Sequence, residues 1–207
     1  MGISQRSAHH KETNDAVHSD APHRRRVTAA LVRRIMNTRD EIIELIKTPK
    51  PIQKEMVLQW MSSDDLSIRG ALYMFTNKAW SYIKPELSMQ EQCSFMRCYL
   101  IECLEKNQNK EDELVHSGFE AAWEIASWLK HLRKIKGTDT ILQEIIADLE
   151  RLYRKANEET RNRITTGALE HIFEDSELVP LFEKWRRDPD LRTAYSAALE
   201  WGKDHRK

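Results

Sequence analysis

The sequence predicts an all-α fold of seven to nine helices, and three observations carry this prediction. Glycine and proline, which most often interrupt helices, number only six each among the 207 residues. Leucine, glutamate, lysine and arginine, which favour helices, are abundant. Apolar residues recur three and four positions apart over long stretches, the spacing of one helix face. Two arrangements remain open: an irregular helical bundle and a short solenoid.

The first 23 residues are expected to be a disordered tail. They carry four of the eight histidines, and their large aliphatic residues Ile3 and Val17 are isolated. Such a segment cannot bury enough apolar surface to offset the entropy of ordering it. Residues 24–207 are expected to form a single all-α domain, since this length suits one core.

The first helix of the domain is expected to end at Thr48-Pro49-Lys50-Pro51, because proline cannot continue a helix. Its apolar face would be formed by Val27, Leu31, Ile35, Thr38, Ile42 and Leu45. After a short segment over 53–61, the polar run 62–65 predicts the N-cap of a helix that reaches about Lys84.

A further helix is predicted to start at Ser88-x-x-Glu91, which has the pattern of a capping box, and to continue to about Glu105. Cys93, Cys98 and Cys103 lie on this helix, five residues apart. Each step of five turns the helix by roughly 140°, so the thiols point to different sides. We expect small buried apolar residues rather than a disulfide or a metal site.

Two long helices are expected in the middle of the chain, from about Lys110 to Lys136 and from Thr138 or Thr140 onward, with Gly137 ending the first. The apolar seam of the first helix is Leu114, Gly118, Ala121, Ile125, Trp128, Leu132 and Ile135. The second helix repeats the spacing at Leu142, Ile145, Leu149, Leu152 and Ala156. The two helices are expected to form an antiparallel hairpin.

The C-terminal region is predicted to contain shorter helices. The polar residues 157–166 are expected to fray or bend the chain. Short helices are expected around 169–173 and from about Leu178. Asp188-Pro189 is expected to open the last helix, with Asp188 as N-cap and proline at the first helical position.

Composition and motifs exclude several function classes. Lys plus Arg equals Asp plus Glu at 33 each, so no net charge attracts the protein to nucleic acid or to a membrane surface. No apolar run is long enough to span a bilayer, and the first twenty residues hold no secretory signal, so a cytoplasmic location is expected. The sequence contains no phosphate-binding loop, nucleophile elbow or zinc-protease motif, so neither a cofactor nor a bound metal is expected.

One stripe of the helix expected over 110–136 combines titratable residues with a large aromatic one. At 100° per residue, the stripe lies opposite the apolar seam and holds His116, Glu120, Trp123, Glu124, Ser127 and His131. Two interpretations remain open. The stripe is either a solvated face whose tryptophan is covered by another helix or by the tail, or a partner-binding face with Trp123 as its anchor.

An arginine cluster supports an alternative function. Residues 21–39 contain six arginines and no acidic residue, at positions Arg24, Arg25, Arg26, Arg33, Arg34 and Arg39. Such a segment can contact nucleic-acid phosphates. No DNA- or RNA-binding motif accompanies it, and an arginine run at a domain edge often pairs with acidic helices of its own chain.

The C-terminal residues also resemble the end of certain all-helical bacterial proteins of unknown function. The resemblance covers about 40 residues and is carried by Gly167–Glu174, Phe182-x-x-Trp185, Asp188-Pro189-x-Leu191, Tyr195 and Trp201-Gly202. It implies no activity and no site, and the same residues are typical of core and cap positions in packed helices.

The sequence therefore favours an intracellular protein–protein interaction module, an adaptor or an immunity-type binding protein whose partner is another protein. A nucleic-acid-associated regulator that uses residues 24–39 is the alternative. An enzyme with a site dispersed over several helices is the third candidate.

Overall fold

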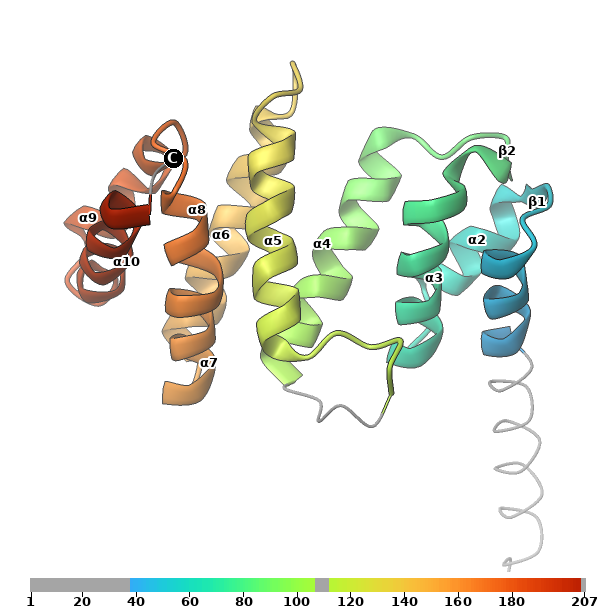
Figure 1. The fold of residues 1–207 in the computed structure, drawn as a ribbon, viewed down its shortest axis with the longest axis horizontal. Helices are drawn as coiled ribbons and strands as arrows, with labels where there is room; N and C mark the ends of the chain where they lie inside the picture. The colour runs from blue at the N-terminus through green and yellow to red at the C-terminus, as the bar shows by residue number, and fades with distance from the viewer. Residues whose placement is uncertain (1–37, 107–111, 206–207) are drawn as a thin grey trace, which may run out of the picture.

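The computed structural model describes residues 38–106 and 112–205. Within these ranges the chain is almost entirely helical, which confirms the predicted all-α fold. Figure 1 shows the helices side by side along the longest axis of the molecule, in an order that largely follows the chain. The predicted tail over 1–23 lies outside the described residues.

The N-terminal elements include a short strand pairing that the sequence did not reveal. Residues 38–47 are helical and are followed by β1 (Ile52–Gln53) and α2 (Lys54–Met61). Later in the chain, β2 (Ile83–Lys84) pairs with β1 in parallel. Ile52 and Ile83 face each other in this register, and both are buried, so the pairing closes this end of the core.

The next helix, α3 (Leu66–Ala79), begins where the polar run predicted. The carboxylate of Asp65 accepts hydrogen bonds from the backbone N–H groups of Ser67 and Ile68, at 2.8 and 3.4 Å. The predicted end at Lys84 is wrong. α3 ends at Ala79 and a 3₁₀ turn over Trp80–Tyr82 leads into β2, because the chain here contributes to the strand pairing.

The capping box predicted for α4 (Met89–Lys106) is confirmed. The backbone N–H of Ser88 donates to Glu91 Oε2 at 2.7 Å, and the N–H of Glu91 donates to Ser88 Oγ at 3.2 Å. The two residues thus satisfy backbone donors that a helix leaves without intrahelical partners.

The predicted helix over 110–136 is wrong at both ends. α5 runs only from Gly118 to Leu132. A second capping box sets its start: the side chain of Ser117 accepts from the N–H of Glu120, and the side chain of Glu120 accepts from the N–H of Ser117. Residues 112–117 therefore form an irregular segment, and His116 lies before the helix rather than on it.

The turn between α5 and α6 (Asp139–Lys155) is longer than predicted. Gly137 adopts φ +84°, the left-handed conformation expected of a glycine that ends a helix. Thr138 does not cap α6 with its side chain. Its hydroxyl donates instead to the carbonyl oxygens of Leu132 and Ile135, at 2.7 and 2.8 Å, and so closes the turn.

Residues 157–166 are helical, contrary to the expectation that they fray. α7 (Glu158–Asn162) continues through a π-helical segment (Arg163–Leu169) into α8 (Glu170–Phe173). Arg163 explains why this polar stretch is ordered. Its buried guanidinium donates to Glu159 at 2.8 Å and to Thr160 Oγ1 at 2.6 Å.

The C-terminal elements are a 3₁₀ turn over Val179–Phe182, then α9 (Glu183–Arg187) and α10 (Arg192–His205). α10 thus begins slightly later than the predicted Asp188-Pro189 start. Four of the C-terminal core residues suggested by the sequence are buried, namely Phe182, Trp185, Leu191 and Tyr195. Trp201 remains partly exposed.

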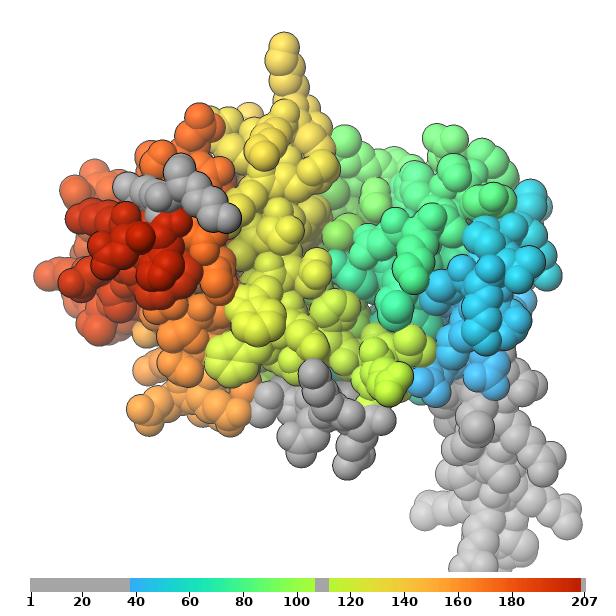
Figure 2. All heavy atoms as spheres, viewed as in Figure 1, coloured from blue at the N-terminus to red at the C-terminus, as the bar shows by residue number. Residues whose placement is uncertain are grey.

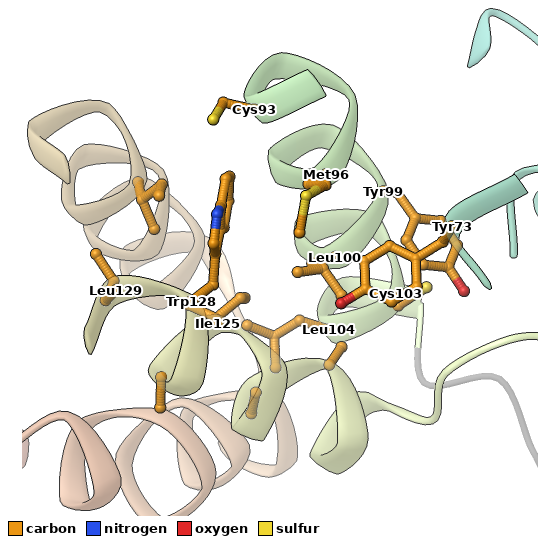
Figure 3. Close-up of a cluster of buried hydrophobic side chains, with 14 of the residues drawn as sticks. Tyr73, Cys93, Met96, Tyr99, Leu100, Cys103, Leu104, Ile125, Trp128 and Leu129 are labelled. Atoms are coloured by element: carbon orange, nitrogen blue, oxygen red, sulfur yellow. The ribbon is translucent and has the colours of Figure 1, made fainter. Parts of the chain in front are cut away.

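The central core lies between α4 and α5. Figure 3 shows Met96, Leu100 and Leu104 of α4 facing Ile125 and Trp128 of α5. α5 packs closely against α4 on one side and the π-helical segment on the other, and α6 packs beside α4. The predicted hairpin of α5 and α6 is therefore wrong about the main partner of α5. No helix in the described ranges combines the length and the apolar character needed to cross a membrane.

Candidate functional site

Two large aromatic side chains of α5 are exposed to solvent. Phe119 is 39% exposed and Trp123 is 52% exposed, and their ring centroids lie 6.4 Å apart. α5 reaches the surface in the middle of the face shown in Figure 2, where it is coloured yellow to yellow-green. No described helix covers Trp123, so the interpretation in which another helix buries it does not hold.

A pocket of about 370 Å³ opens beside Trp123, between α3, residues 113–116 and α5. Four of the five residues predicted for a partner site line it: His116, Glu120, Trp123 and Glu124. Its other lining residues are Tyr73, Met74, Glu113, Leu114 and Val115. The fifth predicted residue, His131, is exposed near the far end of α5 and does not line the pocket.

His116 is held at the rear of this pocket by Tyr99. Its Nδ1 lies 3.0 Å from Tyr99 Oη, and its backbone N–H donates to the same oxygen at 3.2 Å. Burial lowers the pKa of His116, although the carboxylates of Glu124 and Glu120 oppose that shift. His116 is therefore expected to be neutral near pH 7.

A second tyrosine connects α3 to α5 across the pocket. The hydroxyl of Tyr73 donates to Glu124 Oε2 at 3.0 Å. The Tyr73 ring lies edge-on to His116 at 4.9 Å and tilted against Tyr99 at 5.3 Å, and Figure 3 shows the two tyrosines side by side. Burial raises the pKa of both tyrosines, so both hydroxyls stay protonated and serve as hydrogen-bond donors.

The aromatic surface continues from α5 onto α8 and α10. The Trp123 ring lies 6.3 Å from His171 in an edge-on arrangement, and His171 lies 5.1 Å from Trp201 in the same way. Glu174 holds His171 in place, with Oε1 2.9 Å from Nδ1, and also accepts a hydrogen bond from Lys130 at 2.6 Å. We call Phe119, Trp123, His171 and Trp201 the aromatic face.

The arginine cluster of the alternative function is only partly described. Arg39 is ion-paired with Asp112 at 2.8 Å, as expected for an arginine that meets an acidic residue of its own chain. The other five arginines lie outside the described residues, so nucleic-acid binding stays a prediction.

Catalytic and metal chemistry finds little support in the described ranges. They hold no group of three or more His, Cys, Asp or Glu side chains placed to bind a metal ion. Cys93 and Cys103 are buried as predicted, whereas Cys98 is exposed, which is a correction. Burial raises the pKa of Cys103 to about 11, and a protonated thiol is a poor nucleophile at neutral pH.

Sequence reasoning missed Phe119, Tyr73 and Tyr99. The two tyrosines sit within apolar stretches of α3 and α4, where their spacing is that of ordinary core residues. The start of α5 did have a sequence signal, because Ser117-x-x-Glu120 has the same capping-box pattern as Ser88-x-x-Glu91. A helix starting there would have placed Phe119 and Trp123 four residues apart on one face.

No protein-family model, no curated protein and no solved structure matches this chain. The functional argument therefore rests on the geometry of the described residues.

Proposed function

We propose that this protein is a protein–protein interaction module that binds its partner through the aromatic face and the pocket beside it. The observation that carries the proposal is the 52% exposure of Trp123 next to the 39% exposed Phe119. Single exposed apolar residues are common on protein surfaces. Two adjacent large aromatic side chains at the rim of a pocket match the anchors that supply most of the binding energy in interfaces.

The charge of the pocket supports a partner group of stated chemistry. Its lining includes three carboxylates, those of Glu113, Glu120 and Glu124, and neither a lysine nor an arginine. The Trp123 and Tyr73 rings line the same space. Carboxylates and aromatic faces both attract cations. The partner group proposed for the pocket is therefore the side chain of a lysine or arginine.

Affinity purification from cells that express the protein tests this proposal. Wild-type protein, the double variant Phe119→Ala/Trp123→Ala and a control variant would be compared by quantitative mass spectrometry, after nuclease treatment. Met56→Ala is the control, because Met56 is exposed to a similar degree, at 40%, but lies on α2. Proteins recovered with the wild type and the control should be lost with the double variant.

A charge variant tests the proposed partner group. Glu113 is exposed, so Glu113→Gln should leave the fold intact while weakening the attraction for a cation. Binding of a recovered partner should weaken in this variant and with increasing salt. Equal recovery by the wild type and the Phe119→Ala/Trp123→Ala protein would contradict the proposed face. Nuclease-sensitive recovery would favour the arginine-cluster alternative.

A further inference from the structure

A second and larger cavity lies at the other end of the described structure, between α2, α3 and α4, which are neighbours in Figure 1. Its volume is about 690 Å³, within the range of roughly 300–1,000 Å³ typical of small-molecule sites. It shares no lining residue with the pocket beside Trp123. The inference drawn from it is therefore independent of the proposed partner face.

The walls of this cavity are largely apolar. Leu58 and Met61 of α2 face it, and Phe95 of α4 forms the opposite side. Lys54, Leu58 and Met61 are spaced by four and three residues, so one face of α2 supplies both apolar wall and a cation. Leu58 is 37% exposed, although it is a large aliphatic residue in the middle of a helix. An apolar ligand body would cover this surface.

Arg69 supplies a buried cation to the same cavity. It lies on α3 with only 8% of its surface exposed, and it lines the cavity. Its Nη2 forms an ion pair with Glu102 Oε2 at 2.6 Å. Its Nε is buried and finds no hydrogen-bond partner among the described residues. A buried guanidinium with unused donor capacity is costly unless a further acceptor approaches it.

The local charge balance leaves this guanidinium incompletely neutralised. Glu102 is shared between Arg69 and Lys106, whose Nζ lies 2.6 Å from Glu102 Oε1. The second lining cation, Lys54, pairs with Glu91 at 2.8 Å, and this contact lowers the pKa of Glu91 to about 2. The two carboxylates thus face three cations, which leaves one positive charge beside an apolar cavity.

We infer that this cavity binds a small amphipathic anion, with its apolar body against Leu58, Met61 and Phe95 and its carboxylate directed to Arg69. The hydroxyls of Ser62, Ser88 and Ser94 and the amide of Gln90 also line the cavity. They provide neutral polar contacts for the remaining carboxylate surface. The apolar body accounts for the exposed Leu58, and the carboxylate accounts for the unused donors of Arg69.

Cys98 provides a built-in reporter for this site. Its thiol lines the cavity and is solvent-exposed, whereas the other two cysteines of the chain are buried. Alkylation by iodoacetamide, followed by mass spectrometry, should therefore proceed first at Cys98. A ligand in the cavity should slow this reaction.

The experiment compares three eight-carbon probes: octanoate, octylammonium and octanol. Octanoate should slow alkylation of Cys98 and give a saturable isotherm by calorimetry, and the other two should bind roughly tenfold more weakly or not at all. Arg69→Gln should weaken octanoate binding by roughly tenfold or more. Leu58→Gln changes an exposed wall residue, so it should fold normally and also weaken binding. Trp123→Ala, at the other pocket, should bind octanoate as the wild type does.

Two results would overturn the inference. One is the absence of both protection and heat with octanoate. The other is equal protection by all three probes, which would show an apolar crevice without preference for an anion. If Arg69→Gln does not fold, the probe comparison and Leu58→Gln still decide the question. Normal octanoate binding by Trp123→Ala together with failed partner recovery would reject the partner face alone.

Discussion

The carbonyl group of Leu114 lies directly against the Cα of Gly70. A Cβ placed on Gly70 would sit 2.2 Å from the Leu114 oxygen, far inside van der Waals contact, and 3.1 Å from Tyr99 Oη. Only glycine fits this close approach of two backbones. The contact fixes the irregular segment before α5 against α3, and His116 reaches the pocket because of it.

Gly70→Ala should therefore destabilise the protein by about 1–3 kcal/mol, since backbone must move to admit the methyl group. Gly137→Ala is the matched control. Gly137 has φ +84° and nothing within 4 Å of an added Cβ, so only local strain of about 1 kcal/mol is expected. Denaturant unfolding measures both effects. NMR signals of His116 should shift in Gly70→Ala and not in the control; unchanged signals in both variants would contradict this explanation.

Trp123→Ala and Trp185→Ala should differ strongly in stability. Trp123 is 52% exposed, so its truncation should change the free energy of unfolding by no more than about 1 kcal/mol. Trp185 is completely buried, and its truncation should cost about 3–5 kcal/mol. Urea denaturation followed by circular dichroism gives both values. A large loss with Trp123→Ala would mean that this ring supports the fold rather than a partner.

Ser117→Ala should destabilise the start of α5 by about 1 kcal/mol, because it removes the hydroxyl that accepts from the N–H of Glu120. Ser127→Ala is a suitable control, since Ser127 is exposed within the same helix and alanine favours helix there. The measured quantity is the free energy of unfolding. Equal stability of the two variants would argue against the capping box.

His116 should make stability depend on pH. Its pKa is lowered in the folded protein, so below about pH 6.5 the unfolded chain binds the proton more readily than the folded one. The stabilisation is complete above about pH 6.5 and is lost as the pH falls through the folded pKa. Glu120, Glu124, Tyr73 and Tyr99 surround the imidazole.

The measurement compares the wild type with His116→Gln at pH 7.5 and pH 5. The difference in unfolding free energy between the two proteins should be larger at pH 7.5, because glutamine does not titrate. The same difference at both pH values would show that His116 takes up its proton equally in both states.

Local signals in the sequence located the elements that depend on neighbouring residues. Asp65, the capping box at Ser88 and Gly137 are each determined within a few positions, and each was predicted correctly. The pairing of β1 with β2 was missed, since it joins segments about thirty residues apart and each strand has only two residues. Short pairings of this kind carry no periodic signal.

The candidate site was predicted correctly in part, from a premise that was wrong. His116 was grouped with Glu120, Trp123 and Glu124 as if all four lay on one helix. Three of them do lie on α5, but His116 joins them through the irregular segment held by Gly70. Tyr73 and Tyr99 arrive from α3 and α4, and such long-range packing depends on the tertiary fold.

The π-helical segment Arg163–Leu169 sets the rotational phase of everything that follows it. Hydrogen bonds of the i→i+5 type accommodate one residue more than an α-helix of the same course. Removing one residue here would restore α-helical geometry and rotate α8 by about 100°. Ile172 and Phe173 would then leave the core, and His171 would turn away from Trp123. The continuity of the aromatic face across α5 and α8 thus depends on the length of the chain at this point, and a single-residue deletion should disrupt it even where every aromatic side chain is retained.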